Sequence, residues 1–344
     1  MKKFLKILGK VFAFVGVTVG MVFVCLLLTI TLICHGPSNS AKELFATTIL
    51  ETGQLKFLAN VFLSKDEIEG IVSKNSLQDM NAEIDENLIE TNVDKTKELI
   101  EIHEVNGNNF EGKMMIVNDP SKISLATTYP WGEYGKELGV LTEEAGAIAG
   151  VNGGIYYSSG NKGGRPLGVT VSNGEIQDIS LGLAGLYLIG FDENNLLRVI
   201  SLDGMNKAQV EELIKTEKIR DAVAFQEEAS DKNNHFVKLI INGEKRELNG
   251  MGSGANPRTA IGQRKDGSVL ILVTDGRGKN GHLGATASDI IDIMAEYGAV
   301  NAANLDGGSS SSLYYNHEYL MTSVTFYYAN SSWRLPTAFV VKDN

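Results

Sequence analysis

Cysteine is almost absent from this chain, and the positions of the two cysteines are informative. Of 344 residues only Cys25 and Cys34 are cysteines, and both fall in an apolar stretch near the N-terminus. The chain beyond residue 34 therefore has no disulfide and no thiolate ligand for a metal. Its stability has to come from the burial of apolar side chains.

Long apolar runs are also scarce, because residues 11–34 form the one uncharged stretch of membrane-spanning length. About two dozen residues rising ~1.5 Å each as a helix cross the ~30 Å of bilayer hydrocarbon. The four basic residues that precede the stretch are Lys2, Lys3, Lys6 and Lys10. The positive-inside rule then predicts a single-pass protein of the cell membrane, with a cytosolic N-terminus and an extracellular main domain. A cleaved signal peptide has a shorter apolar region, so we expect a retained anchor.

Basic residues are also fewer than acidic ones. Without the four N-terminal lysines, 27 of the 31 basic residues remain against 42 acidic ones, a balance of −15. A surface of this sign repels a phosphate backbone, which excludes nucleic acid as a partner. Any anionic substrate must be met by basic groups that are placed locally.

The length suits one large domain with accessory segments. We expect a cytosolic basic tail at residues 1–10, a transmembrane anchor at 11–34, a juxtamembrane helical stalk at 35–109 and one domain at 110–344. In the stalk, Ser64 and Glu67 match a capping box. The apolar residues Ile68, Ile71 and Val72 follow at helical spacing. The acidic stretch 75–104 is interpreted as a spacer without chemistry.

From residue 110 onward, short apolar runs alternate with Asn, Asp and Gly, which is typical of strands. The runs lie at residues 114–117, 123–126, 186–189 and 196–200. Two helices interrupt them: residues 207–216, with Asn206 as N-cap, and residues 287–297, capped by Thr286 and Asp289. The sequence predicts the α+β class, with a large mixed β-sheet.

A hairpin is predicted in the C-terminal half. An Asp266-Gly267 turn joins residues 256–262 to the apolar strand 269–274. Antiparallel pairing around this turn places Arg258 opposite Thr274. The Arg258 guanidinium should therefore lie near the residues that follow the second strand.

Two aspartates should share one edge of this sheet. Asp275 ends the strand 269–274, and a glycine-rich loop, the helix 287–297 and a strand at 300–305 lead to Asp306. A strand-helix-strand crossover joins parallel strands, whose carboxyl ends lie at the same edge. Ligands bind beyond such ends. Asp275, Asp306, Arg258 and Arg277 are therefore expected to converge there.

The chemistry of these groups points to hydrolysis of a sugar linked to phosphate. Glycoside hydrolysis needs one carboxyl group to protonate the leaving oxygen and another to activate water or attack the sugar. Asp306 and Asp275 are the candidate catalytic residues, in an order that the sequence leaves open. Arginine binds phosphate oxygens with paired hydrogen bonds, which makes Arg258 and Arg277 candidates for the phosphate. The other candidate substrate- or phosphate-binding residues are Thr259, Asn152, Gly153, Gly154, Asn304, Gly307, Gly308, Ser309, Ser310 and His282.

Other catalytic motifs are missing. No H-E-x-x-H spacing and no G-x-S-x-G elbow occur. The sequence requires no cofactor and defines no metal ligands. A divalent cation, Ca²⁺ or Mg²⁺, between Asp275 and Asp306 stays an open alternative, because hard cations favour carboxylate oxygens. The oligomeric state is also open.

Four motifs, in this order, resemble the phosphodiester glycosidase family over roughly residues 110–342. They are Gly150-Val151-Asn152-Gly153-Gly154, Pro257-Arg258-Thr259-Ala260-Ile261-Gly262, Val273-Thr274-Asp275-Gly276-Arg277 and Asn304-Leu305-Asp306-Gly307-Gly308-Ser309. The resemblance implies an enzyme that removes a sugar joined through its anomeric oxygen to a phosphodiester. In bacteria it implies a role at envelope polysaccharides, exopolysaccharides or teichoic-acid-like polymers.

Two departures from the family pattern concern the substrate. Ser309 stands where the family usually has a third glycine, and Gln226-Glu227-Glu228 replaces a usual Gly-Pro turn. The two glutamates would repel an anion if they faced the pocket. Two alternatives stay open: a non-catalytic polysaccharide-binding or scaffolding module, and a phosphodiesterase that cleaves the P–O bond.

Overall fold

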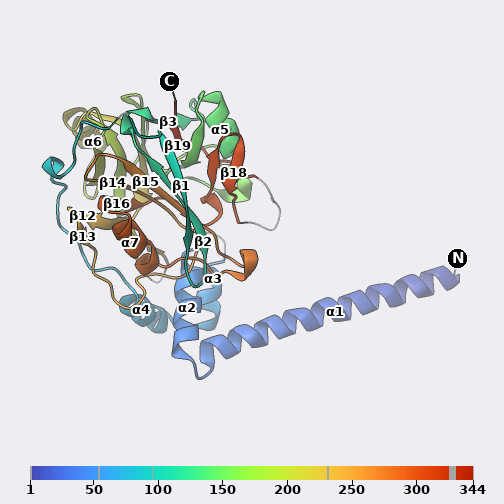
Figure 1. Ribbon diagram of the computed structural model, residues 1–344. Coiled ribbons are helices and arrows are strands. Elements are labelled where there is room, and N and C mark those ends of the chain that lie inside the picture. The colour runs from blue at the N-terminus through green and yellow to red at the C-terminus, as the bar shows by residue number, and fades with distance from the viewer. Residues whose placement is uncertain (1, 53–54, 95, 231, 325–330, 344) are drawn as a thin grey trace.

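The structure is a computed structural model that describes residues 2–52, 55–94, 96–230, 232–324 and 331–343 (Figure 1). A long helix, α1 (Lys2–His35), projects from a rounded body rich in strands. Three short helices lie at the end of the body that α1 joins through its C-terminal end: α2 (Asn39–Leu50), α3 (Phe57–Phe62) and α4 (Lys65–Lys74). The architecture is of the predicted α+β class.

The helix α1 has the length and composition of a membrane span. Among the described residues, 3–35 form the one helix that is long and apolar enough to cross a bilayer. Its apolar side chains are exposed along most of its length. Thr18, Thr29 and Thr31 donate their hydroxyls to carbonyl oxygens of the preceding turn, which satisfies these polar groups inside an apolar stretch. A membrane anchor and a signal sequence both fit these properties.

The helices α2 to α4 form a small bundle around the end of α1. The predicted capping box starts α4: Ser64 and Glu67 each accept from the backbone of the other. The bundle's core contains the predicted apolar residues Ile68, Ile71 and Val72, and Ile30 and Cys34 of α1 pack into it. The C-terminal end of α1 is therefore fixed to the bundle by apolar contacts.

The α-helical part of this region ends with α4 at Lys74, whereas the sequence predicts a helical stalk as far as residue 109. A short 3₁₀ turn, η1 (Glu86–Leu88), precedes the strand β1 (Ile100–Asn106), which pairs with β2 (Glu111–Val117). Backbone hydrogen bonds from Gln78 to Glu247 and from Glu90 to Lys265 hold the segment between α4 and β1 on the body. The charged residues of β1 did not predict a strand, because β1 lies at the edge of its sheet, where exposed positions tolerate charge.

Seven strands form the largest sheet, in the order β1, β2, β15, β14, β16, β12, β13. The bounds not yet given are β12 (Lys238–Ile241), β13 (Glu244–Lys245), β14 (Thr259–Arg264), β15 (Val269–Thr274) and β16 (Ala299–Asn304). The helix α7 (Ala287–Glu296) packs on one face, against Leu270 and Leu272. Val269, Ile271 and Val273 face the main core on the other side. Burial on both faces explains why β15 is a continuous apolar run.

Two five-stranded sheets and a small hairpin complete the body. One five-stranded sheet runs β18 (Glu318–Met321), β17 (Leu313–Tyr315), β4 (Ala149–Asn152), β19 (Thr337–Val341), β3 (Ile123–Thr127). The other runs β6 (Glu175–Ser180), β5 (Gly168–Ser172), β9 (Ile219–Gln226), β7 (Leu186–Asp192), β8 (Leu197–Ser201). The hairpin is β10 (Glu228–Ala229) and β11 (Asn234–His235). The helix α5 (Leu138–Glu144) packs on the first of these five-stranded sheets, and α6 (Lys207–Thr216) packs on the second. The main core joins all three sheets.

The predicted hairpin and helix caps are confirmed. Thr274 donates its N–H to the Arg258 carbonyl at 2.9 Å, so these residues lie opposite each other. Asn206 caps α6 and Thr286 caps α7, each within a capping box.

The crossover from β15 through α7 to β16 has one strand between its ends. The strand β14 pairs antiparallel with both β15 and β16, so β15 and β16 run parallel to each other without being neighbours. Their carboxyl ends therefore lie at one edge of the sheet, as predicted. The residues that follow each strand, and those that precede β14, meet at this edge.

Candidate active site

Asp306 occupies a tight turn at this edge. Gly308 donates its N–H to the Pro257 carbonyl at 2.8 Å, which fixes the turn against the start of β14. A 3₁₀ turn, η5 (Gly308–Ser310), follows. Ser310 donates its hydroxyl to Asp306 Oδ2 at 2.6 Å, and the Tyr156 hydroxyl lies 3.1 Å from Ser310 Oγ. The Asp306 carboxyl group is thus held by a short chain of hydroxyls.

The surroundings of Asp306 suit acid/base chemistry. Burial raises the pKa of Asp306 to about 7, against the opposing effects of Ser310, the Gly307 N–H and Arg277. A carboxyl group with this pKa exchanges its proton near neutral pH, as a general acid or base must. Burial also raises the pKa of Tyr156, which keeps its hydroxyl protonated.

Asn152 and Thr259 lie behind this turn. Asn152 Nδ2 donates to the Asp306 carbonyl at 2.6 Å, and Asn152 Oδ1 accepts from Thr259 Oγ1 at 2.9 Å. Both residues are fully buried. The structure therefore places them as supports of the turn that carries Asp306, whereas the sequence predicts that Asn152 positions substrate.

The glycines that follow Asn152 are required by packing. A Cβ on Gly153 would collide with Thr337, and one on Gly154 with the Ala224 carbonyl. Asn304 is also buried, and its Nδ2 donates to the Phe236 carbonyl at 3.2 Å. Residues 152–154 and Asn304 thus serve mainly to pack the sheets around the site.

Arg277 is the basic group whose charge lowers the pKa of Asp306. Its Nη1 donates to Ser309 Oγ at 2.8 Å and its Nε to Asn256 Oδ1 at 3.3 Å. Burial and the nearby Arg258 lower the pKa of Arg277 to about 10, so the guanidinium stays charged at neutral pH. Within the described residues its Nη2 meets no protein acceptor. The structure brings a cation with a free donor beside Asp306.

Gly308 lets Arg277 approach the turn. Its backbone has φ of +62°, and a Cβ there would lie 2.5 Å from Arg277 Nη2. Glycine is the residue that combines this conformation with such close approach.

Arg258 is engaged more fully than the sequence suggests. Its Nη2 pairs with the buried carboxylate of Glu51 and donates to the Gly254 carbonyl at 2.6 Å and to Ser253 Oγ at 3.0 Å. Its Nε donates to the Ala285 carbonyl at 3.1 Å. In the described part of the chain only Nη1 lacks a protein partner. Nothing in the sequence around Glu51 marks it as part of a site, and the surrounding segment was interpreted as a stalk.

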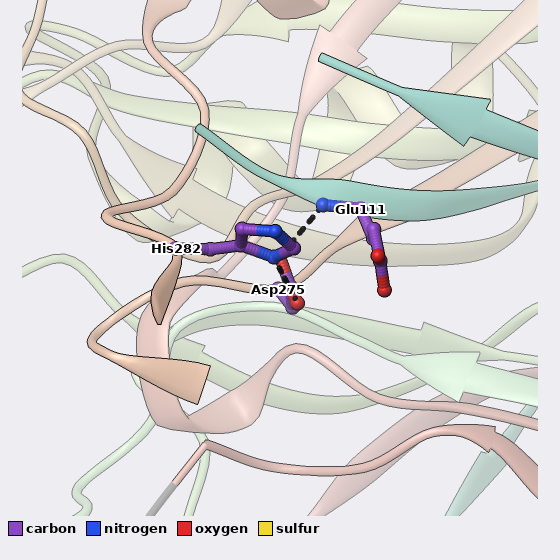
Figure 2. Close-up of side chains that lie close together, drawn as sticks. All are labelled: Glu111, Asp275 and His282. Carbon is purple, nitrogen blue, oxygen red and sulfur yellow. Dashed lines mark hydrogen bonds and ion pairs between the residues drawn. The ribbon is translucent and has the colours of Figure 1, made fainter. Parts of the chain in front are cut away.

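Asp275 lies at the predicted edge, but its hydrogen-bond partners differ from those of Asp306. Its carboxylate accepts the Glu111 N–H at 2.8 Å and lies 2.9 Å from His282 Nδ1 (Figure 2). The two aspartates have no common partner among the described residues. The expectation of a pair of catalytic carboxyl groups is therefore not matched by the contacts of Asp275. Side-chain direction after a strand's last residue depends on the loop, here residues 276–284, which the sequence pattern does not determine.

Glu111, Asp275 and His282 have the donor types for a cation, with ligand atoms within 4.8 Å of one another. We expected any cation between Asp275 and Asp306, and these donors lie instead on the Asp275 side. The hydrogen bond between Asp275 and His282 accounts for the cluster without an ion. No cofactor is established for the chain.

The two glutamates of the departing motif, Glu227 and Glu228, both have hydrogen-bond partners within the protein. Glu227 pairs with Arg246 at 2.6 Å and accepts the Val237 N–H at 3.0 Å. Glu228 accepts hydrogen bonds from Gln226 and Asn233, at 2.9 and 2.7 Å. Glu227 is therefore balanced by Arg246, whereas Glu228 is hydrogen-bonded by neutral side chains and keeps its negative charge.

Comparison with known proteins identifies related sequences and folds. The profile described as phosphodiester glycosidase matches residues 145–342, more than half of the chain. The catalytic domain of zebrafish N-acetylglucosamine-1-phosphodiester alpha-N-acetylglucosaminidase, solved as a form auto-inhibited by its pro-peptide, is 18% identical with a TM-score of 0.53. The match covers 73% of this chain and 86% of that one, and it shows a shared fold.

Two further matches are weaker or shorter. A putative exported protein from Burkholderia pseudomallei is 15% identical with a TM-score of 0.44, over 68% of this chain and 74% of that one. The SPbeta prophage-derived uncharacterized protein YomE of Bacillus subtilis is 46% identical over 56 residues, which are 16% of this chain and 8% of that protein.

Proposed function

The chain belongs to the phosphodiester glycosidase family, and from this we propose that it hydrolyses a glycosyl phosphodiester at its sugar–oxygen bond. Water adds its oxygen to the anomeric carbon while the bond from that carbon to the bridging oxygen breaks. The products are a free sugar and a phosphomonoester that keeps the bridging oxygen. The proton lost by water passes to Asp306.

The observation that carries this proposal is Asp306 beside Arg277. A carboxylate with a pKa near 7 is a stronger base than an ordinary aspartate and suits the activation of water. The free Nη2 of Arg277 suits the phosphate, whose charge grows as the bond breaks. A leaving group neutralised in this way needs a proton less than a sugar alkoxide does, so a single acid/base carboxyl group suffices.

The remaining residues then support these two groups. Ser310 and Tyr156 hold the Asp306 carboxyl group, and Asn152 and Thr259 hold its backbone. The turn at Gly307, Gly308 and Ser309 leaves room for Arg277. Asp275, through His282 and the Glu111 backbone, supports the loop that carries Arg277 and takes no part in proton transfer.

We place the reaction at the outer face of a membrane. The helix α1 serves as a single-pass anchor, because four lysines precede an apolar stretch long enough to span the bilayer. The natural substrate is then a phosphate-containing glycan of the cell envelope, such as an exopolysaccharide or a teichoic-acid-like polymer.

Hydrolysis in ¹⁸O-labelled water tests the bond that is cleaved. A panel of sugar-1-phosphodiesters is incubated with the full-length protein in detergent, and the products are analysed by mass spectrometry. We expect the label in the sugar. Label in the phosphate would instead identify a phosphodiesterase, and binding without product would identify a non-catalytic module.

Asp306→Asn should reduce kcat by at least about a thousandfold, because the variant cannot accept a proton. Turnover is measured on the substrate identified in the panel, with circular dichroism as the control for folding. A folded variant with near-normal kcat would refute the role of Asp306.

A further inference from the structure

Glu51 is a buried carboxylate that comes from outside the family domain. It follows the last residue of α2, almost a hundred positions before the matched region 145–342 begins. Its side chain is 2% exposed. Burial raises the pKa of this carboxyl group, while Arg258 and the Gly254 N–H lower it. Burying such a group is costly unless its oxygens are fully hydrogen-bonded.

Four donors from the domain meet this carboxylate. Oε1 accepts from the Gly254 N–H at 2.7 Å and from Asn234 Nδ2 at 3.1 Å. Oε2 accepts from Asn256 Nδ2 at 3.0 Å and pairs with Arg258 Nη2. Both oxygens are therefore satisfied, and two segments remote from α2 in sequence, at residue 234 and at residues 254–258, converge on the side chain that follows this helix.

Asn256 connects Glu51 to the reacting groups. Its Nδ2 donates to Glu51 Oε2 and to the Thr48 carbonyl, at 3.0 and 3.3 Å. With the nitrogen held toward α2, its Oδ1 faces Arg277 and accepts from Nε at 3.3 Å. Glu51 thus determines which end of the Asn256 amide Arg277 meets.

Glu51 also sets the local charge. Arg258 lies close enough to Arg277 to lower the pKa of that group, and Asp306 and Glu51 act in the opposite direction. With Glu51 ionised, its charge balances Arg258, and Arg277 remains as the unbalanced cation next to Asp306. Without it, two like charges lie side by side in a poorly solvated place.

We propose that Glu51 is a positioning residue of the active site, which orients Arg277 through Asn256 and balances Arg258, so that the juxtamembrane helix α2 completes the phosphate subsite. This inference rests on the proposed function for the role of the subsite, but the subsite itself can be tested without turnover. Glu51 touches no reacting atom and acts through its two partners.

Inorganic phosphate is the probe, and its affinity distinguishes positioning from simple charge. Glu51→Gln removes one negative charge, so electrostatics alone predicts tighter phosphate binding by the full-length protein. Positioning predicts the opposite: calorimetry should show phosphate affinity reduced about tenfold, and kcat/KM for the glycosyl phosphodiester reduced on the order of tenfold to a hundredfold. Glu51→Asp, which keeps the charge, should fall between Glu51→Gln and the wild type.

Asp192→Asn is the matched control. It removes another buried carboxylate paired with an arginine, Arg198, near the end of β14 that is remote from Arg258. It should lower thermal stability while phosphate affinity and kcat/KM stay unchanged. If it weakens phosphate binding as much as Glu51→Gln does, the effect is general destabilisation and the inference is overturned.

A double-mutant cycle tests the route through Arg277. In an Arg277→Lys background, Glu51→Gln should cost little further phosphate affinity, because the group that it positions is gone. Fully additive losses, or Glu51→Gln binding phosphate as well as the wild type, would overturn the inference. A wild type that binds phosphate but hydrolyses no phosphodiester would refute the proposed function and leave Glu51 as a positioning residue of an anion site.

Discussion

At the scale of single residues, burial of the Asp306 carboxyl group raises its pKa and lowers the free energy of unfolding above neutral pH. The folded protein holds its proton up to pH about 7, whereas an unfolded aspartate releases it near pH 4. Between these values the folded state binds more protons, so stability falls as the pH rises through this window. Above pH 7 the full cost of a buried carboxylate is present.

Asp306→Asn should therefore stabilise the protein while it abolishes activity. We expect its Tm to exceed that of the wild type by a few degrees at pH 8, and the difference to shrink toward zero at pH 4. Differential scanning calorimetry at both pH values measures it. A difference that is the same at pH 4 and pH 8 would contradict a raised pKa for Asp306.

The sequence predicts Asp306 and Arg277 as site residues, and the structure brings them together at the predicted edge. It does not predict the side-chain directions at the strand ends, so Asp275 turns toward His282. Glu51 and Tyr156 could not be found, because each reaches the site through packing between segments remote in sequence. No local pattern encodes such contacts.

At the scale of elements, the turn 306–310 and the loop 276–284 work as a pair. The turn presents Asp306 and the loop presents Arg277, whose Nη1 donates to Ser309 Oγ and whose Nη2 lies where a Cβ on Gly308 would project. A side chain at Gly308 would therefore displace the guanidinium from the turn that carries Asp306.

Gly308→Ala should reduce kcat/KM by about tenfold or more, because the new Cβ displaces Arg277 Nη2. Gly146→Ala is the control: its φ of +65° is similar, but no atom lies within 4 Å of the added Cβ. Both should lose about 1 kcal/mol of unfolding free energy from backbone strain. Equal activities of the two variants in steady-state kinetics would contradict the proposed contact.

Most strands and helices with a strong pattern were predictable, since caps and apolar periodicity are local signals. Among the elements that were not predicted are β1, where Glu101, His103 and Glu104 occupy an edge strand, and the short helix α5. The insertion of β14 between β15 and β16 was not predictable either, because strand order is decided by contacts across the whole sheet.

At the scale of the whole molecule, the proposed function places the domain at a membrane through α1. In a host cell we expect the full-length chain in the membrane fraction, retained after a high-salt wash and released by detergent, with the domain digested by protease added outside intact cells. Immunoblotting of the fractions measures this. A shortened chain in the medium would identify residues 1–35 as a cleaved signal peptide instead.

Because Ile30 and Cys34 pack into the bundle, no flexible linker separates α1 from the helices α2 to α4 within the residues that the structure describes. With α1 in the bilayer, residues 11–29 supply the ~30 Å that the hydrocarbon requires, and the bundle begins where the lipid ends. Glu51 follows α2, a helix of twelve residues that begins shortly after α1 ends. If α1 is a retained anchor, this packing confines the domain to the bilayer surface, and we expect its substrates to be glycans attached close to the membrane.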